Sequence, residues 1–284
     1  MDSTFTIAIL SYNHPEITSR CVESVLKYAE QSTPIVLIHN GSADQHRNLL
    51  QHRFPEIEHV VLQKNIGFSG GADAVLRFGF QQSPWVLFLT NDTHLQTPVD
   101  QISRGIDNLL PGMYAPKIIW PKSGQTDSWG GWLSLLNGEL RHEKTGYFRS
   151  DKENCFYVPG SAFLIHRDAY FATAGFDQSF GTYWEDVDLS LQFQACGLPL
   201  GTVDFLELTH LGGKTCRKDS TYTIFYYFRN QRKVLNRWLP KLVSRPRQFK
   251  IVYCIWIKTF KKFYSLARQS RWTDMKKLVN SFNT

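Results

Sequence analysis

The segment FTIAILSYNHPEITSRCVESVL, residues 5–26, has the pattern of a buried strand followed by an amphipathic helix. Phe5 to Leu10 is an apolar run of strand length, and Pro15 suits the first turn of a helix, where its missing N–H is not needed. One face of that helix would carry the apolar residues Ile17, Cys21, Val22, Val25 and Leu26. The segment therefore predicts a strand–helix unit with polar residues at its junction.

Further strand and helix patterns follow at similar spacing. Ile35–Ile38, His59–Leu62 and Trp85–Leu89 have strand patterns, and Gly71–Phe80 has a helical one. Strands that alternate with helices predict an α/β fold with a mostly parallel sheet and helices on both faces. Ligands of such sheets bind beyond the carboxyl ends of the strands, so functional residues are expected there.

Polar or glycine-rich residues follow all four predicted strands. They form the stretches Ser11–Asn13, His39–Asp44, Asn65–Gly71 and Thr90–Thr93. Glycines would let a ligand approach the backbone, and a following helix N-terminus could bind phosphate. Neither common phosphate-loop pattern is present, and each stretch alone is also typical of ordinary turns.

Three carboxylates, Glu185, Asp186 and Asp188, follow the aromatic residues Tyr183 and Trp184 where a loop enters a predicted helix. The first turn of a helix stabilises ionised acids, which suits a general base acting on a sugar hydroxyl. Compensation of the helix dipole explains such acids equally well. The residues alone therefore leave catalytic and structural roles open.

In their order along the chain, these motifs resemble those of inverting family-2 glycosyltransferases, from about Phe5 to His210. The resemblance rests on Tyr12–Asn13, Asn40–Asp44, Asn65–Phe68, Phe88–Thr93 and Gly175–Leu189. It implies a Rossmann-like GT-A fold, a part in cell-envelope polysaccharide synthesis, and transfer of a sugar with inversion to a hydroxyl of a glycan or lipid-linked glycan. The segment Tyr226–Asn230 is most similar to rhamnosyltransferase-type members, which makes rhamnose one candidate sugar.

The resemblance also implies where the nucleoside-diphosphate sugar, carried on UDP or dTDP, would bind. The implied donor-binding residues are Ser11, Tyr12, Asn13, Asn40, Asn65, Gly67, Asn91, Asp92 and Lys214. The family usually has an Asp where this chain has His39, and this difference concerns recognition of the nucleobase.

Thr90-Asn91-Asp92 resembles the family's Asp-x-Asp metal motif, with Thr90 in place of the first acid. The resemblance implies a divalent cation, Mn²⁺ or Mg²⁺, bound by Asp92 and by His210 together with diphosphate and water. A single carboxylate is compatible with such a site, and a His ligand fits Mn²⁺ better than Mg²⁺. Without the resemblance, a hydrogen bond within a turn would be the simpler role for His210.

Asp186 is the catalytic base that the resemblance implies, with Glu185 and Asp188 as rivals. Tyr183 and Trp184 would pack on the acceptor sugar or belong to the core. An inactive relative that binds a nucleotide sugar or scaffolds a membrane assembly is an alternative interpretation. A nucleotidyltransferase is another, although the Gly/Arg-rich loop expected after its first strand is missing.

With 284 residues, of which 42% are hydrophobic, the chain can bury the core of a folded enzyme. Charge is divided unevenly, because residues 217–284 contain 17 Lys and Arg but only two acids, while the whole chain has a net charge of +7. We expect a catalytic domain over 1–216 and a basic, aromatic-rich helical segment over 217–284. Within the expected catalytic domain, the Trp-rich region 112–158 predicts hairpins that could cover an acceptor site or form a small aromatic core.

Apolar residues recur at helical spacing from Phe249 to Ala267 among several lysines. This pattern predicts a helix lying on an anionic membrane surface or packed against the catalytic part. The helix has too few consecutive apolar residues to span a bilayer. Nucleic-acid binding is disfavoured because no recognisable motif accompanies the basic residues. Residues 1–5 lack a signal-peptide pattern and the five Cys lack paired spacing, which predicts a cytoplasmic protein, peripheral on the inner face of the cytoplasmic membrane.

Overall fold

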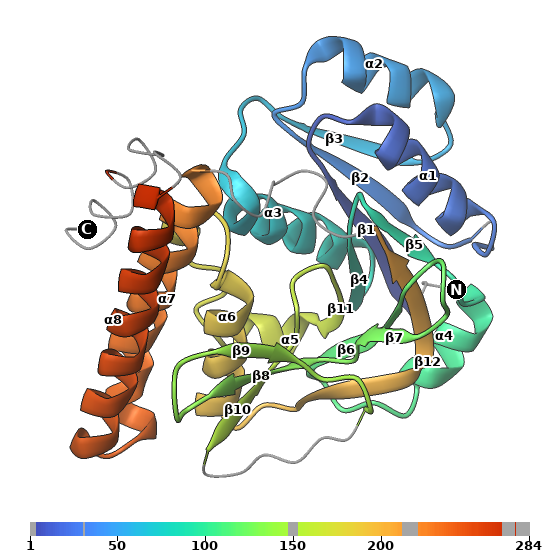
Figure 1. The fold of residues 1–284 in the computed structure, drawn as a ribbon. Helices are drawn as coiled ribbons and strands as arrows, with labels where there is room; N and C mark the ends of the chain where they lie inside the picture. The colour runs from blue at the N-terminus through green and yellow to red at the C-terminus, as the bar shows by residue number, and fades with distance from the viewer. Residues whose placement is uncertain (1–3, 31, 147–152, 212–220, 269–275, 277–284) are drawn as a thin grey trace.

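The computed structural model describes residues 4–30, 32–146, 153–211, 221–268 and 276. Its main feature is a nine-stranded sheet with the order β3-β2-β1-β4-β11-β6-β12-β5, in which β7 pairs with β6 (Figure 1). The strands of this sheet are β1 (Phe5–Ser11), β2 (Ile35–Asn40), β3 (Glu58–Leu62), β4 (Trp85–Thr90), β5 (Thr93–Leu95), β6 (Met113–Ile119), β7 (Thr126–Ser128), β11 (Ala162–His166) and β12 (Leu200–His210).

The four strands expected from the sequence form one continuous parallel half of the sheet. β1 pairs in parallel with β2 and β4, and β2 pairs in parallel with β3, so their carboxyl ends lie at one edge. Beyond β4, strand β11 is antiparallel to both β4 and β6, whereas β12 is parallel to β6. The predicted α/β fold with a largely parallel sheet is confirmed.

Helices cover both faces of the sheet, as predicted. Alternate residues of β1 enter two cores, because Ile7 and Ile9 join one cluster while Ala8 and Leu10 join the other. Residues of α1 and α4 close the first core, and residues of α3, α5 and α6 close the second. These helices are α1 (Pro15–Leu26), α3 (Gly67–Gln82), α4 (Val99–Ile106), α5 (Arg167–Phe171) and α6 (Glu185–Ala195).

Two helices differ from the expectation. Helix α2 (Asp44–Arg53) buries only Leu50, so its sequence lacks the apolar periodicity that reveals a helix. Helix α3 begins at Gly67 rather than Gly71, because the low helix propensity of glycine conceals its first turn. Gly71 is needed there for close packing, since a Cβ would lie 2.8 Å from Nδ2 of Asn40.

The Trp-rich region forms hairpins, as expected, including a second sheet of order β10-β8-β9. Its strands are β8 (Gly131–Ser134), β9 (Leu140–His142) and β10 (Asn154–Tyr157). Trp132 meets Phe156 edge to face with 5.4 Å between ring centroids, and Nε1 of Trp129 donates a hydrogen bond to the Val203 carbonyl. The first contact lies within the second sheet, between β8 and β10, whereas the Trp129 bond ties the chain just before β8 to β12 of the main sheet.

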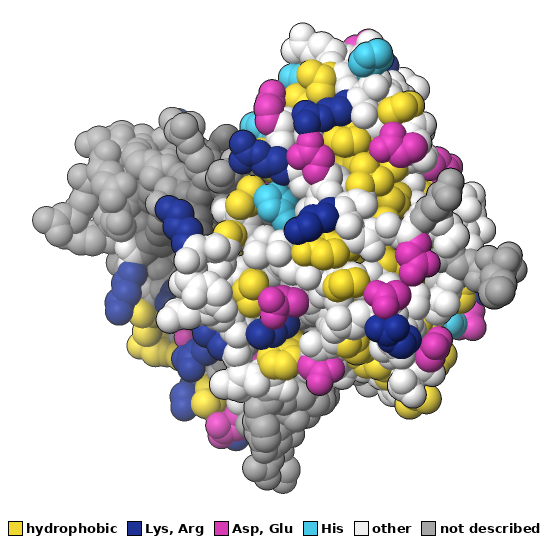
Figure 2. All heavy atoms as spheres, turned by 90° about the vertical axis from the view of Figure 1, so that its right-hand side faces the viewer, with side chains coloured by type: hydrophobic (Ala, Val, Ile, Leu, Met, Phe, Trp, Pro, Cys, Tyr) yellow, Lys and Arg dark blue, Asp and Glu magenta, His cyan; other side chains and the backbone are white. Residues whose placement is uncertain are grey.

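Two long helices, α7 (Thr221–Leu242) and α8 (Arg245–Arg268), lie side by side at one end of the molecule (Figure 1). Val234 and Trp238 of α7 and Ile251 of α8 share a core with Val187 and Leu191 of α6. The segment therefore packs against the catalytic part, and the predicted boundary at residue 216 falls outside the described residues. Acidic and basic side chains are mixed on the face shown in Figure 2, whereas α7 and α8 contain no acidic residue.

A buried ion pair joins α6 to α7. The Asp188 carboxylate, with 1% of its side chain exposed, lies 2.9 and 3.0 Å from Nη1 of Arg237. It also accepts hydrogen bonds from Nε1 of Trp238 at 2.8 Å and Nε2 of Gln192 at 2.9 Å. Since an ionised carboxylate is costly to bury without partners, this cluster depends on every one of its donors.

Arg237→Ala should lower the free energy of unfolding by about 3 kcal/mol, because it leaves the Asp188 carboxylate buried without its cation. Urea unfolding measures the change. The control is Arg104→Ala, which removes an ion pair with Asp100 at 2.9 Å whose side chains are 73% and 48% exposed, and should cost less than about 1 kcal/mol. Equal losses in the two variants would contradict a structural role for the buried pair.

Candidate active site

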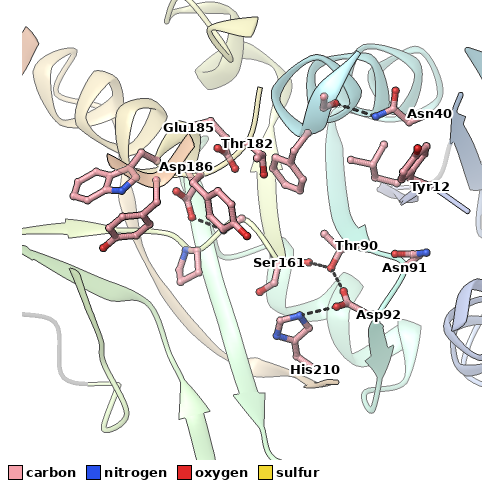
Figure 3. A pocket seen from close by; sticks show the side chains of 18 of the residues that line it. Tyr12, Asn40, Thr90, Asn91, Asp92, Ser161, Thr182, Glu185, Asp186 and His210 are labelled. Atoms are coloured by element: carbon pink, nitrogen blue, oxygen red, sulfur yellow. Dashed lines mark hydrogen bonds and ion pairs between the residues drawn. The ribbon is translucent and has the colours of Figure 1, made fainter. Parts of the chain in front are cut away.

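A cavity of about 800 Å³ opens at the carboxyl ends of the parallel strands. Its volume is in the range of small-molecule sites. The predicted residues that line it are Tyr12, Asn40, Asn65, Gly67, Asn91, Asp92, Tyr183, Trp184, Glu185, Asp186 and His210. The structure thus brings together stretches separated by up to two hundred positions, and Figure 3 shows Asp92 with His210 on one side and Asp186 on another.

Asn40 organises the side of the cavity where the donor is expected to bind. Its Nδ2 donates to the Gly67 carbonyl at 2.9 Å (Figure 3), and its Oδ1 accepts from the Ile66 N–H at 3.1 Å. Oδ1 of Asn65 accepts from the Gly67 N–H at 2.8 Å, and the Ser69 N–H donates to the carbonyl of Gly181. At least two N–H groups at the N-terminus of α3 therefore form hydrogen bonds within the protein. These groups are not free for a phosphate, which argues against the expected phosphate site.

Ser11 and Asn13, both expected to bind the donor, do not line the cavity. The Ser11 hydroxyl is buried and lies 2.9 Å from that of Thr18, which also accepts from Nδ2 of Asn91. Asn13 joins the first loop to the second, because its N–H donates to the hydroxyl of Ser42 at 2.9 Å. Both residues therefore shape the loops instead of facing the ligand. Lys214, the remaining donor candidate, lies outside the described residues.

His39, the departure from the family pattern, faces another histidine. Its ring stacks on that of His59 with centroids 5.3 Å apart, and Nε2 lies 3.0 Å from Nδ1 of His59. Burial, together with the charges of His59 and Arg47, lowers the pKa of His39 to about 4. A neutral His39 therefore occupies the end of β2 and does not line the cavity.

Asp92 and His210 form the polar corner expected to hold a cation. Oδ2 of Asp92 lies 3.2 Å from Nε2 of His210, and Oδ1 accepts from the Thr90 hydroxyl at 2.8 Å (Figure 3). Burial alone would raise the pKa of Asp92, but the hydrogen bond and charge of His210 and the Thr90 hydroxyl outweigh it and hold this pKa below its usual value. Asp92 is therefore a carboxylate at neutral pH.

This corner fits a hard or borderline divalent cation. Two ligands at about 2.1 Å from one ion, in adjacent positions, are roughly 3 Å apart, close to the observed separation of Asp92 and His210. No third His, Cys, Asp or Glu joins them among the residues that the structure describes. The remaining ligands would be diphosphate oxygens and water, a coordination that Mg²⁺ and Mn²⁺ accept.

Asp186 lies in the first turn of α6, where two backbone N–H groups stabilise its carboxylate. Gly160 donates to Oδ2 at 2.9 Å and Val187 donates to Oδ1 at 2.8 Å. Burial nevertheless raises the pKa of Asp186, because these donors offset only part of the lost hydration. A carboxylate with a raised pKa is a stronger base for a hydroxyl proton.

The two rival bases lie in different surroundings. Glu185 lines the cavity but is 6% exposed, and its Oε2 has no hydrogen-bond partner within the described part of the chain. Burial and the charge of Asp186 raise the pKa of Glu185 well above the usual value, so Asp186 ionises first. Asp188, one of the three candidate bases, is not placed to act as one. Its carboxylate binds Arg237 and Trp238 between α6 and α7 and does not line the cavity.

Aromatic residues form the wall next to Asp186. Trp184 is 2% exposed and belongs mainly to the core, with its ring 5.7 Å from that of Tyr227. Tyr183 is more open, and its hydroxyl lies 3.2 Å from that of Thr223. Of the two proposed acceptor residues, Tyr183 is therefore better placed to meet a sugar.

Several lining residues had been given no role in the site from the sequence. They are Leu10, Phe68, Thr90, Leu140, His142, Tyr157, Pro159, Gly160, Ser161, Thr182 and Tyr227. Pro159-Gly160-Ser161 lies between two apolar runs, and this turn signal could have revealed the loop that contacts Asp186. Leu140 and His142 come from β9, and no local pattern indicates that this hairpin reaches the cavity.

Comparison with known proteins assigns the family. The model of glycosyl transferase family 2 matches residues 6–171, more than half of the chain. The chain belongs to this family. The match ends before Asp186 and His210, whose place in the same cavity is a result of the structure.

The curated relatives are transferases from Pseudomonas. Undecaprenyl-phosphate 4-deoxy-4-formamido-L-arabinose transferase of Pseudomonas aeruginosa (strain UCBPP-PA14) is 27% identical over 150 residues, covering 51% of this chain and 44% of that protein. The protein of the same description from Pseudomonas paraeruginosa is 28% identical over 151 residues, with the same coverage. The chain thus spans less than half the length of these relatives.

Solved structures confirm the expected GT-A fold. GalNAc-T7 with UDP, GalNAc and Mn²⁺ aligns with a TM-score of 0.63 at 15% identity, covering 85% of this chain and 49% of that one. TarS 1–349 of S. aureus aligns with 0.61 at 12% identity, covering 98% and 81%. The mannosyltransferase PcManGT of Pyrobaculum calidifontis, with GDP-Man and Mn²⁺, aligns with 0.56 at 11% identity, covering 98% and 73%.

The pH dependence of turnover should report Asp186. If Asp186 is the base, turnover needs its carboxylate, whose pKa is raised, so the rate should fall as the pH drops through a value above the ordinary range of an Asp. Glu185→Gln replaces a group that is neutral in that range, and should leave the acid limb of the pH–rate profile in place. Loss of turnover in this variant would instead identify Glu185 as the base.

Proposed function

We propose that the protein transfers a sugar, with inversion, from a nucleoside-diphosphate donor to a hydroxyl of a glycan or lipid-linked glycan. The observation that carries this proposal is the placement of Asp92 with His210 and of Asp186 in one cavity (Figure 3). The first pair suits the phosphate end of a donor, and Asp186 suits the acceptor. Solved relatives with UDP or GDP-Man and Mn²⁺ support this assignment.

Asp186 would accept the proton of the acceptor hydroxyl. The acceptor oxygen then bonds to the anomeric carbon while the bond from that carbon to the diphosphate oxygen breaks on the opposite face, which inverts the configuration. Asn40 and Tyr12 would hold the nucleotide side, and Asp92 and His210 would hold the divalent cation. The cation, when bound, supplies positive charge to the departing diphosphate.

The residues near Asp186 favour a neutral hydroxyl over a phosphate as the nucleophile. The Pseudomonas relatives are named for undecaprenyl phosphate, whose oxygens are already anionic and need no base. Here Asp186 faces the cavity as a carboxylate beside the neutral Glu185, and an anionic nucleophile next to that carboxylate would be repelled. The acceptor is therefore proposed to be a sugar hydroxyl, of which a lipid carrier would be a remote part.

The donor can be found by thermal shift over UDP-, dTDP- and GDP-linked sugars with Mn²⁺, because a bound ligand raises the apparent stability. dTDP-rhamnose belongs in the screen because of Tyr226–Asn230. If no nucleotide sugar binds in a metal-dependent way by calorimetry, the proposed function is wrong. Binding without transfer or hydrolysis would support an inactive relative.

Substitutions at the two sides of the cavity should separate binding from chemistry. Asp186→Asn should keep metal-dependent donor binding but lose about a hundredfold or more of turnover, because the base is gone. Asp92→Asn should instead weaken the metal-dependent part of donor binding, since Asp92 is the only carboxylate that the described part of the chain places in that corner. Calorimetry with UDP and Mn²⁺ and initial rates with the identified donor measure both. The same pattern of loss in both variants would contradict separate roles.

We also propose that α8 lies on an anionic membrane surface, with the protein peripheral to the cytoplasmic membrane on its inner face. Phe249, Val252 and Tyr253 on α8 are 75%, 54% and 62% exposed, and helical spacing places them together. Arg245, Arg247 and Lys250 lie beside them on a helix without acids. None of the described helices is both long and apolar enough to cross a bilayer.

Changing Phe249, Val252 and Tyr253 together to Ser should weaken binding to phosphatidylglycerol vesicles, measured by co-sedimentation, at least about a hundredfold. Each large apolar side chain that no longer inserts loses about 2 kcal/mol, and about 1.4 kcal/mol is already tenfold in affinity. Leu49→Ser, Leu110→Ser and Phe171→Ser together form the control, since these side chains are also largely exposed, at 47%, 69% and 51%, but lie outside α7 and α8. Native protein that sediments equally with neutral phosphatidylcholine vesicles, or not at all, would contradict the proposal.

A further inference from the structure

The loop that precedes α6 has an unusual backbone. Gly181, Tyr183 and Trp184 have φ angles of +70°, +68° and +71°. Only glycine adopts this left-handed region readily, and each of the other two residues costs on the order of 1 kcal/mol or more. Since α6 begins directly afterwards at Glu185, the position of Asp186 depends on this strained loop.

Asn230 of α7 holds the loop through its backbone. This residue is 0% exposed, and its Nδ2 lies 2.8, 2.7 and 2.8 Å from the carbonyl oxygens of Phe180, Thr182 and Tyr183. Nε of Arg229 donates to Oδ1 of Asn230 at 2.9 Å, which fixes the amide with its N–H groups toward the loop. Because these bonds go to backbone carbonyls, they fix the backbone of residues 180–183 whatever side chains those residues carry.

The same loop reaches both sides of the cavity. On the donor side, the Ser69 N–H of α3 donates to the Gly181 carbonyl at 3.0 Å, and a Cβ at Gly67 would lie 2.8 Å from that oxygen. On the acceptor side, Thr182 and Tyr183 line the cavity immediately before Asp186. A shift of the loop would therefore move the base relative to the donor-binding residues.

We infer that Asn230 is a positioning residue, which holds loop 180–184 in its left-handed conformation and thereby aims Asp186 at the acceptor hydroxyl. The role in turnover rests on the proposed function, whereas the restraint on the loop does not. Asn230 lies on a helix beyond the matched family region and does not line the cavity, so it acts through the loop. Helix α7 is accordingly a part of the catalytic unit.

Gln231 offers a matched control on the next position of α7. It is 5% exposed, and its Nε2 donates to the Gly138 carbonyl at 3.0 Å in the turn between β8 and β9. Asn230→Ala and Gln231→Ala both remove a buried amide from a backbone carbonyl, so both should lower stability. Only Asn230→Ala releases the loop that leads to Asp186.

Hydrogen exchange of single amides tests the restraint without any substrate. In Asn230→Ala, the amides of Ser69 and Gly160 should exchange at least about tenfold faster, because their acceptors, the Gly181 carbonyl and the Asp186 carboxylate, become mobile. In Gln231→Ala these two amides should keep the native rate. The Gly41 amide, which donates to the Leu62 carbonyl, should be unchanged in both variants.

Turnover tests the consequence for the base. Asn230→Ala should lower kcat on the order of a hundredfold, as expected for a misplaced catalytic group, while calorimetric binding of UDP with Mn²⁺ stays native. Its pH–rate profile should move its acid limb to lower pH, since water that reaches Asp186 lowers its pKa. Gln231→Ala should keep the native kcat and profile for its folded fraction.

Each outcome decides the inference. Native exchange at Ser69 and Gly160 in Asn230→Ala would overturn the restraint, and native kcat with fast exchange would overturn the positioning role. If the native protein turns over no donor, the proposed function fails, while the exchange result still decides whether Asn230 holds the loop. Should Asn230→Ala not fold, Asn230→Ser retains one donor and should give the same changes to a smaller degree.

Discussion

Parallel pairing of β1 with β2 and β4 is the constraint on which the rest of the protein depends. It brings the ends of three strands to one edge, so that Tyr12, Asn40 and Asp92 meet although they are far apart in sequence. Alternate residues of the same strands fill the cores on both faces, which leaves little freedom of register. The geometry of the donor side thus follows from the packing of the core.

The side of the cavity proposed to bind the acceptor is built differently, from irregular segments that other elements hold in place. Asp186 owes its position to the Gly160 N–H, to the left-handed loop before α6 and to α7 behind it. The positive φ angles of Tyr183 and Trp184 raise the conformational energy of this loop, and the buried contacts of Asn230 and Arg237 offset that cost. Strain concentrated beside a proposed base is typical of a site that must be rigid before its substrate arrives.

Much of this arrangement could be predicted from sequence where regular periodicity exposes it. The βα units and the carboxylates after the loops have local patterns, whereas the roles proposed for Asp92 and Asp186 come from the family resemblance. What could not be predicted depends on tertiary contacts. Asp186 and Asp188 are only two positions apart in the sequence, yet Asp188 binds Arg237 in the interior whereas Asp186 faces the cavity. Ser11 and Asn13 match the family motif but bind neighbouring loops.

Helices α7 and α8 cover Trp184, Val187 and Leu191, the apolar residues on the outer side of the loop and helix that carry Asp186. A fragment that ends near residue 216 would leave this surface open to water and remove the cation from Asp188. The smallest portion of the chain that can be produced as a stable, crystallisable catalytic domain must therefore extend at least through Ile251. An expressed fragment that ends where the family match ends, at residue 171, would lack α6, which carries Asp186, and α7, which packs against α6.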